Sequence, residues 1–251
     1  MGGVNGCKAA FSRLHLRLAR SGRSLPKVAR NDEKEQDSGP GAPAPAWLPY
    51  TRSGDDGETV LGDFSRTDKA NPRIAAYGEC EEAAAFLGYT INNGTGLTND
   101  MVRLLTRVQN DLIDVAADIC TPMTGHDAHD VRISQVYVSR LERACDHFAE
   151  ELTSPATFVV PGGTVTAALL YYAYTLVRRC ERSVVAVLHS DRDGCNPRTQ
   201  IYLNRLANLL LVLARAANEE HGDTPWEPGL SAEIDQVELW EPLPEDAGSP
   251  D

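Results

Sequence analysis

Hydrophobic residues recur three and four positions apart in five stretches of the chain, which is the spacing that places them on one face of an α-helix. Each stretch is long enough for several helical turns, and short polar segments separate consecutive stretches. Amphipathic helices of this kind bury their apolar faces against one another, so the pattern predicts an all-α fold, a five-helix bundle. The predicted helices span residues 71–91, 98–120, 134–152, 162–188 and 196–222.

The second and fifth stretches carry the clearest signals. The second aligns Val102, Leu105 and Val108 with later apolar residues on one stripe. The fifth opens with Asn196 at the expected N-cap and Pro197 at the first helical position, a common way to begin a helix. We expect this last helix to end near residue 222.

The two ends of the chain differ from its middle. Residues 1–30 carry seven basic residues and no acidic one. This composition is typical of an organellar transit peptide, but it also fits an unstructured extension or translation from a start codon set too far upstream. The composition predicts a disordered basic extension and linker over residues 1–46, a helical domain over 47–229 and an acidic disordered tail over 230–251.

The overall charge limits the choice of partners. The chain has a formal net charge of -12, and its basic residues are enriched in the N-terminal extension. An acidic domain is a poor binder of nucleic acid, because phosphate neutralisation needs a positive surface. No run of 18 apolar residues appears, so no membrane span is predicted.

The cysteines and histidines predict neither a disulfide framework nor a metal site. The six cysteines form no CxxC pair, and we interpret them as reduced thiols. His126 and His129 lie in the polar segment GHDAHD, where a solvated loop is favoured over a zinc site.

Residues 50–73 precede the first predicted helix and have only a short apolar core. The stretch TRSGDDGET, residues 51–59, combines glycines with Thr, Ser and Arg side chains. Glycines let backbone N–H groups approach a phosphate, and the side chains donate further hydrogen bonds. The stretch lacks P-loop spacing, and an ordinary surface turn is the alternative.

Another glycine-containing stretch, FVVPGGT at residues 158–164, introduces the fourth predicted helix. A glycine-rich helix start favours anions, whereas a plain helix entry is the alternative. Phe158 lies in its hydrophobic lead-in and on pattern alone is a core residue.

The stretch LVRRCERSVV, residues 176–185, concentrates positive charge on a helix. Arg178 and Arg182 lie one turn apart on the same face, Arg179 is adjacent, and Glu181 is placed to orient them. Arginines bind phosphate oxygens in a bidentate way, so the cluster indicates polyanion binding. A solvated charged helix face is the alternative.

The fifth predicted helix carries amides in an otherwise apolar stretch, YLNRLANLL. Asn204 and Asn208 lie one turn apart, and buried amides need hydrogen-bond partners. Asn204 is a candidate for contacting a nucleotide, and a structural bridge between helices is the alternative.

In this order, YTRSGDDGET, FVVPGG, RRCER, YLNRLANLL and a late PW resemble the PduO-type ATP:cob(I)alamin adenosyltransferases, or corrinoid adenosyltransferases, from about Tyr50 to Gly229. The resemblance implies a five-helix bundle with a Gly-rich N-terminal nucleotide-binding segment. It implies a homotrimer with active sites between subunits that transfers the 5′-deoxyadenosyl group of ATP to cob(I)alamin. Adenosylcobalamin and triphosphate are the products, and Mg²⁺ accompanies ATP.

The resemblance also implies roles for individual residues. Arg178, Arg179 and Arg182 would clamp the triphosphate, with Glu181 orienting them. Phe158 would crowd the lower face of the corrin, which makes cobalt easier to reduce. The residues expected to hold the nucleotide are Thr51, Arg52, Ser53, Gly54, Thr59, Lys69 and Asn204. Expected partners are a reductase and an adenosylcobalamin-dependent acceptor enzyme, and the expected compartment is the cytoplasm, or the mitochondrion if residues 1–46 are a transit peptide.

The chain departs from the family pattern beside these motifs. The family usually has Lys at the position of Arg52. An Asp that pairs across the subunit interface with an Arg is replaced by Glu81, and that Arg by Tyr174. Ala84 and Asn208 replace an Asn and an Asp. These changes keep a second hypothesis open, namely a non-catalytic relative that binds ATP or corrinoid to sense or deliver the cofactor.

Overall fold

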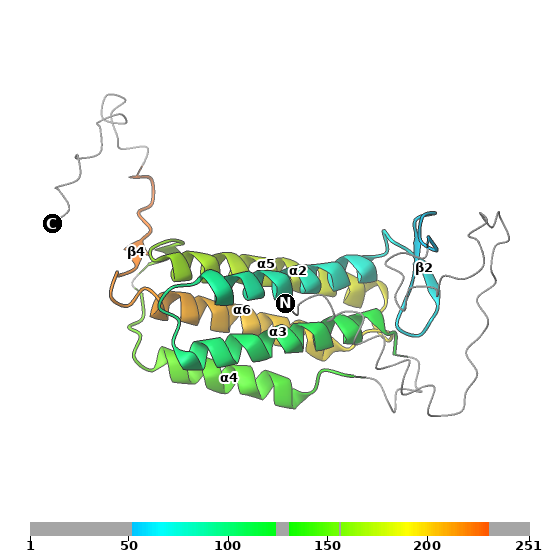
Figure 1. The fold of residues 1–251 in the computed structure, drawn as a ribbon, viewed down its shortest axis with the longest axis horizontal. Coiled ribbons are helices and arrows are strands. Elements are labelled where there is room, and N and C mark those ends of the chain that lie inside the picture. The colour runs from blue at the N-terminus through cyan, green and yellow to red at the C-terminus, as the bar shows by residue number, and fades with distance from the viewer. Residues whose placement is uncertain (1–51, 124–130, 156, 231–251) are drawn as a thin grey trace, which may run out of the picture.

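The computed structural model describes residues 52–123, 131–155 and 157–230, and within these ranges the chain is mostly helical (Figure 1). The five predicted helices are all present. They are α2 (Pro72–Asn93), α3 (Asn99–Cys120), α4 (Gln135–Ala149), α5 (Val165–Ser190) and α6 (Pro197–Ala216).

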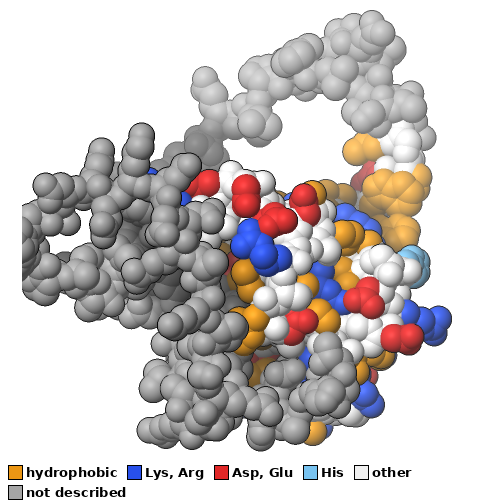
Figure 2. Space-filling model, turned by 90° about the vertical axis from the view of Figure 1, so that its right-hand side faces the viewer, with side chains coloured by type: hydrophobic (Ala, Val, Ile, Leu, Met, Phe, Trp, Pro, Cys, Tyr) orange, Lys and Arg blue, Asp and Glu red, His pale blue; other side chains and the backbone are white. Residues whose placement is uncertain are grey.

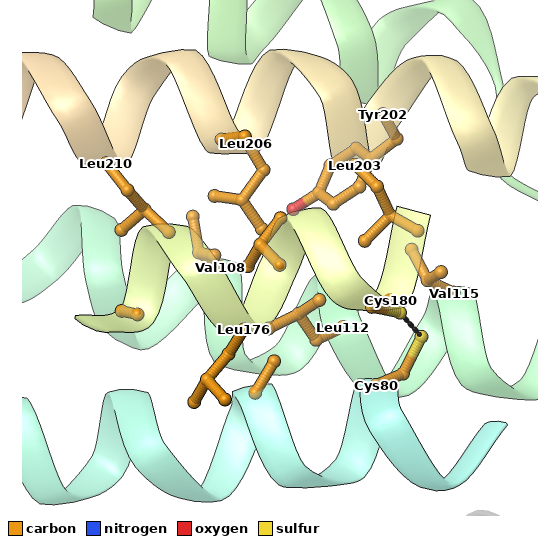
Figure 3. Packing of buried hydrophobic residues seen from close by; sticks show 14 of the residues in the cluster. Cys80, Val108, Leu112, Val115, Leu176, Cys180, Tyr202, Leu203, Leu206 and Leu210 are labelled. Atoms are coloured by element: carbon orange, nitrogen blue, oxygen red, sulfur yellow. Dashed lines mark hydrogen bonds between the residues drawn. The ribbon is translucent and has the colours of Figure 1, made fainter. Parts of the chain in front are cut away.

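The helices pack side by side into a bundle. α2 lies between α3 and α5, α5 packs against α6, and α6 packs against α4. Their apolar stripes meet in a single cluster, in which Leu112, Leu203 and Leu206 are fully buried (Figure 3). The inner face of α2 is built largely from small residues, including Ala76, Cys80 and Ala83, so its neighbours approach it closely. The all-α bundle prediction is confirmed.

Two short antiparallel strand pairs lie at opposite ends of the bundle (Figure 1). At one end, β1 (Glu58–Val60) pairs with β2 (Arg66–Asp68). At the other, β3 (Val159–Val160) pairs with β4 (Thr224–Pro225). The all-α prediction missed both pairs, because strands of two or three residues carry too few positions for an alternating pattern.

The helix termini explain two differences from the predicted boundaries. α5 begins at Val165 rather than residue 162, because Gly163 has a positive φ of 94° and Thr164 caps the helix by accepting a hydrogen bond from the Ala167 amide. α6 ends at Ala216 rather than near Gly222. The predicted start of α6 is confirmed, with Asn196 as N-cap and Pro197 as first residue.

Buried charges fix the end of the bundle next to β1 and β2. The Asp118 carboxylate accepts hydrogen bonds from Arg132 Nη1 at 2.8 Å, the Ile133 amide at 2.7 Å and Asn196 Nδ2 at 2.7 Å. Arg73 donates to the Ile119 carbonyl at 2.6 Å and to Asp191 Oδ2 at 2.6 Å. These contacts satisfy charges that would be costly to bury unpaired.

Several sequence-based expectations fall on other parts of the chain. The extension 1–46, the acidic tail beyond Leu230 and the GHDAHD segment lie outside the described residues. In the part of the chain that the structure describes, no group of three or more His, Cys, Asp or Glu side chains is arranged to hold a metal ion. No described helix is both long enough and apolar enough to cross a membrane.

Candidate functional site

The arginine cluster lies on the outer face of α5. Val177, Cys180 and Val184 point into the core, so the helical period turns Arg178 and Arg182 outward on one side. A shallow hollow beside them is lined by Arg178, Glu181, Arg182 and Val185. Within the described residues, neither Arg178 nor Arg182 forms an ion pair with a carboxylate, so both charges are available to an anion.

Arg178 is held by the residue one turn before it. Its Nη1 atom donates a hydrogen bond to the hydroxyl of Tyr174, and its guanidinium carbon lies 5.2 Å from the centre of the Tyr174 ring. A cation over an aromatic ring is attracted by the negative face of that ring. Tyr174 therefore restrains the direction of the Arg178 side chain.

Arg179 faces the neighbouring helix instead. Its Nη2 atom forms an ion pair with Glu82 of α2, and its Nε atom lies 3.9 Å from Glu79 Oε1. The hydrogen bond with Glu82 raises the pKa of Arg179 further above its already high value. The third arginine of the cluster thus links α5 to α2, whereas Arg178 and Arg182 face the hollow.

Glu181 is oriented from α6. Its Oε1 atom accepts hydrogen bonds from Asn204 Nδ2 at 3.1 Å and from Gln200 Nε2 at 3.4 Å. The Asn204 side-chain oxygen Oδ1 in turn accepts from Arg205 Nη1 at 2.8 Å. Asn204 is half-buried, whereas Asn208 one turn later is exposed. Asn204 bridges two helices in this structure, and its predicted contact with a nucleotide stays a prediction.

The glycine-rich segment folds back on itself at the β1–β2 end. Lys69 Nζ donates a hydrogen bond to the Gly54 carbonyl at 2.5 Å, and the Lys69 amide donates to the Gly57 carbonyl at 2.8 Å. A Cβ atom at Gly54 would lie 3.0 Å from the Glu58 carbonyl oxygen, so a side chain there would be tightly packed against β1. Arg52 has a positive φ of 60°, a strained conformation for a non-glycine residue.

The remaining predicted nucleotide residues of this segment have different surroundings. Thr59 is half-buried on β1 and pairs with Thr67 on β2. Ser53 is exposed, and Thr51 lies outside the described residues. Figure 2 views the bundle from the β1–β2 end, where acidic and basic side chains are interspersed over the described surface.

Phe158 is at the opposite end and is exposed, not part of the core. Its side chain is 78% exposed, and its ring meets Trp226 edge-on with centroids 5.9 Å apart. The Trp226 amide donates to the Phe158 carbonyl at 2.7 Å. Phe158 and the half-exposed Trp226 therefore form an exposed aromatic pair, a candidate contact surface for another molecule.

The PGG turn beside Phe158 is anchored by protein groups. Asn218 donates to the Gly162 carbonyl at 2.9 Å and accepts from the Thr164 amide at 2.9 Å. A Cβ atom at Gly163 would lie 2.3 Å from Asn218 Oδ1. Because Asn218 already occupies the amide of the cap residue, the geometry favours a plain helix entry over an anion site.

The predicted site residues thus fall into three groups along one chain. Arg178, Glu181, Arg182 and Asn204 lie together at the middle of α5 and α6. The residues from Arg52 to Lys69 lie at the β1–β2 end of the bundle (Figure 1), and Phe158 directly precedes β3, which pairs with β4 at the other end. At a 1.5 Å rise per residue, the 26 residues of α5 alone extend about 39 Å.

Three further residues belong to these groups, although none of them was expected at the site. Glu82 pairs with Arg179, Gln200 donates to Glu181, and Trp226 packs on Phe158. Gln200 had a usable signal, since it lies one helical turn before Asn204 on the same face, and Trp226 belongs to the late PW motif.

Comparison with known proteins gives consistent matches. Residues 49–217 match the cobalamin adenosyltransferase family. A corrinoid adenosyltransferase of Mycobacterium tuberculosis is 43% identical over 181 residues, covering 72% of this chain and 93% of its own. A corrinoid adenosyltransferase of Bacillus subtilis is 33% identical over 175 residues, covering 69% of this chain and 88% of its own. A variant PduO-type ATP:corrinoid adenosyltransferase from Lactobacillus reuteri, complexed with cobalamin and ATP, superposes with a TM-score of 0.66 at 30% identity, covering 70% of this chain and 98% of its own.

Proposed function

The chain belongs to the cobalamin adenosyltransferase family, and we propose a role for each of its site residues in the reaction of that family. In that reaction the enzyme transfers the 5′-deoxyadenosyl group of ATP to cob(I)alamin, giving adenosylcobalamin and triphosphate. The bond between C5′ and the triphosphate oxygen breaks, and a bond between C5′ and cobalt forms. Co(I) supplies the electron pair, so the protein needs no side-chain base.

What the protein must supply is position and positive charge. Holding ATP with C5′ towards cobalt makes the reaction effectively unimolecular. The departing triphosphate gains negative charge at the oxygen that leaves C5′, and fixed cations stabilise that charge in the transition state.

Arg178 and Arg182 are proposed to bind the triphosphate. The observation that carries this proposal is that two arginines, which have no carboxylate partner among the described residues, face one hollow in a chain of net charge -12. Arg179 is proposed to support the clamp from its ion pair with Glu82. Glu181 and Asn204, joined by a hydrogen bond, are proposed to face the nucleotide from beside the arginines.

The glycine-rich segment is proposed to wrap the nucleotide. Its contributors are Thr51, Arg52, Ser53, Gly54, Thr59 and Lys69, with Mg²⁺ accompanying ATP. The Lys69 ammonium and the exposed side chains of Arg52 and Ser53 are donors at one end of the bundle, which suits a polyanionic ligand. ATP would then take over the hydrogen bond that Lys69 now gives to Gly54.

Phe158 is proposed to contact the lower face of the corrin. Its exposure and its edge contact with Trp226 support this role, since an apolar macrocycle would cover a ring that water now surrounds. Crowding by Phe158 would displace the lower axial ligand and leave cobalt four-coordinate.

A homotrimer with sites shared between subunits is proposed from the separation of these groups. Lys69 and Phe158 lie at opposite ends of a bundle longer than ATP, so one chain does not supply both to a single site. In the oligomer, the β1–β2 end of one chain would lie beside the β3–β4 end of the neighbouring chain. A reductase that supplies Co(I), an adenosylcobalamin-dependent acceptor enzyme and a cytoplasmic location complete the proposal.

The alternative is a non-catalytic relative that binds ATP or corrinoid, which the changes at Glu81, Ala84, Tyr174 and Asn208 keep open. The experiment is an anaerobic assay of the full chain with ATP and chemically reduced cob(I)alamin, following the loss of Co(I) absorbance. Turnover by the natural chain and its loss in Arg178→Ala would support the transferase. Calorimetric ATP binding without turnover would favour the non-catalytic relative.

A further inference from the structure

A pair of cysteines lies buried beneath the arginine cluster, between α2 and α5. The sulfur atoms of Cys80 and Cys180 are 2.9 Å apart, and both residues are fully buried (Figure 3). Both thiols are free in this structure. The reaction with ATP and corrinoid assigns no role to either of them.

The small residues of α2 make this contact close. Ala76 and Ala83 flank Cys80 on the inner face of the helix, so α5 approaches without a bulky side chain between the two backbones. Cys180 Sγ also lies 3.8 Å from the Ala76 carbonyl oxygen, which holds its side chain towards α2. The two sulfurs therefore face each other across the helix–helix interface.

The geometry needs little change to form a covalent bond. A disulfide has a sulfur–sulfur distance of about 2.05 Å, so the two atoms would approach by less than about 1 Å. We propose that Cys80 and Cys180 are a modification site, which forms a reversible disulfide joining α2 to α5 when the protein meets peroxide.

The chemistry balances with peroxide as the two-electron oxidant. One thiolate sulfur attacks an oxygen of hydrogen peroxide, the O–O bond breaks, and a sulfenic acid and one water form. The second sulfur then displaces the oxygen of the sulfenic acid as another water, giving the disulfide. Two thiols thus lose two protons and two electrons, and the peroxide is reduced to two waters.

The buried surroundings of the two thiols predict that they oxidise slowly and that the disulfide protects them from irreversible oxidation. The hydrogen bond with Cys180, followed by burial, raises the pKa of the Cys80 thiol well above its ordinary value, so the reactive thiolate is rare. Once a sulfenic acid forms, the second sulfur is already in contact with it. Disulfide formation then outruns irreversible oxidation to sulfinic acid, and a thiol reductant restores the pair.

The disulfide would add a covalent link between α2 and α5, which an ion pair already joins near the two cysteines. The neighbouring residue Arg179 of α5 is paired with Glu82, two residues after Cys80 on α2. Joining residues 80 and 180 closes a long loop of chain, which restricts the unfolded state and raises thermal stability. We expect the midpoint of thermal unfolding to rise by about 5 °C or more.

The test is peptide mapping of the full chain after peroxide treatment in its folded state. Trypsin releases Cys80 in the peptide 74–103 and Cys180 in the peptide 180–182, each with a single cysteine. We expect these two peptides to be disulfide-linked before reduction and separate after dithiothreitol. The same treatment in urea should give mixed pairings, because the native contact is lost.

Two variants complete the experiment. Cys180→Ala should abolish both the linked peptide and the peroxide-dependent rise in unfolding temperature. Cys145→Ala, which removes a half-buried cysteine on α4, should keep both. Finding Cys80 and Cys180 as free thiols or as sulfinic acids after oxidation of the natural chain would overturn the proposal, whatever the variants show.

Discussion

Tyr174 and Arg178 form a two-part contact within one helix. The Tyr174 hydroxyl accepts a hydrogen bond from Arg178 Nη1, and the Tyr174 ring lies 5.2 Å from the guanidinium carbon. The resemblance to the PduO-type family implies an arginine at position 174, paired across a subunit interface with an acidic residue of the first helix. In this chain the corresponding acidic residue, Glu81, accepts a hydrogen bond from Tyr77 at 2.7 Å instead. Tyr174 and Glu81 thus each contact a residue of their own helix in this structure.

Removing the Tyr174 hydroxyl should weaken ATP binding without abolishing turnover. Tyr174→Phe keeps the ring under the guanidinium but loses the acceptor, which costs about 1 kcal/mol, or about fivefold in the KM for ATP. Tyr174→Leu loses both contacts and should raise that KM further. Steady-state kinetics with varied ATP measures both variants.

Tyr172→Phe is the matched control, since Tyr172 is an exposed tyrosine on the same helix. It should leave the KM for ATP unchanged. An unchanged KM in both Tyr174 variants would contradict the idea that this residue positions Arg178.

The bridge from Asn204 to Glu181 gives a second prediction. Asn204→Ala leaves the Glu181 carboxylate with Gln200 as its remaining described partner, so Glu181 loses its fixed direction. We expect ATP affinity to fall about three- to tenfold, the size of one ordinary hydrogen bond of about 1 kcal/mol, because the effect reaches ATP only through Glu181. Calorimetric titration with ATP measures the change.

The same helix supplies a control for this measurement. Asn208 is exposed one turn after Asn204, and Asn208→Ala should bind ATP as the natural chain does. Equal losses in the two variants would indicate a general disturbance of α6 rather than a specific role for Asn204.

Sharing of sites between subunits predicts complementation of two inactive variants. Lys69→Ala removes a group at the β1–β2 end, and Phe158→Ala removes one at the β3–β4 end. If each site takes one end from each of two neighbouring chains, random mixing leaves both residues intact in about one quarter of sites. Chains co-expressed in equal amounts should then recover about a quarter of the natural turnover.

A failure of the two variants to complement each other would have a different meaning. If Lys69 and Phe158 of the same chain acted in one site, every site of the mixed oligomer would carry a defect. Mixtures as inactive as the separate variants would rule out the shared arrangement.

The raised pKa of the Cys145 thiol predicts that the protein loses stability at alkaline pH. Burial raises the pKa of this thiol from about 9 to about 11. Between these values the unfolded chain releases a proton that the folded chain keeps, so the free energy of unfolding falls as pH rises through this window. The contribution of this thiol to the free energy of unfolding is fully present below pH 9.

Urea unfolding at pH 8 and pH 10.5 tests this prediction. Cys145→Ala should show a smaller decrease between the two pH values than the natural chain. An equal decrease would mean that other buried thiols and tyrosines account for all of the alkaline destabilisation.

The sequence predicted the helices well because each carries many apolar positions. Leu105, Val108 and Leu112 repeat at helical spacing, and Asn196 with Pro197 marks a helix start that the structure confirms. The strand pairs were missed because each has at most three residues per strand, and the end of α6 was misplaced because contacts of Asn218 with residues distant in sequence determine it.

The candidate site was predictable only where one helix holds it. Arg178 and Arg182 share a face because they are four residues apart, and no tertiary information is needed. The pairing of Arg179 with Glu82 joins residues 97 positions apart, and no local pattern contains it. The exposure of Phe158 likewise depends on how the chain enters α5 and leaves α6, so the apolar pattern alone placed it in the core, whereas the family resemblance implied a contact with the corrin.

The most direct test of the account is to measure both products of one anaerobic reaction of the full chain with ATP and cob(I)alamin. We predict light-sensitive adenosylcobalamin and inorganic triphosphate in equal amounts, with both lost together in Arg178→Ala. Bound ATP that yields neither product, or that is cleaved to ADP without any change at cobalt, would contradict adenosyl transfer by this chain.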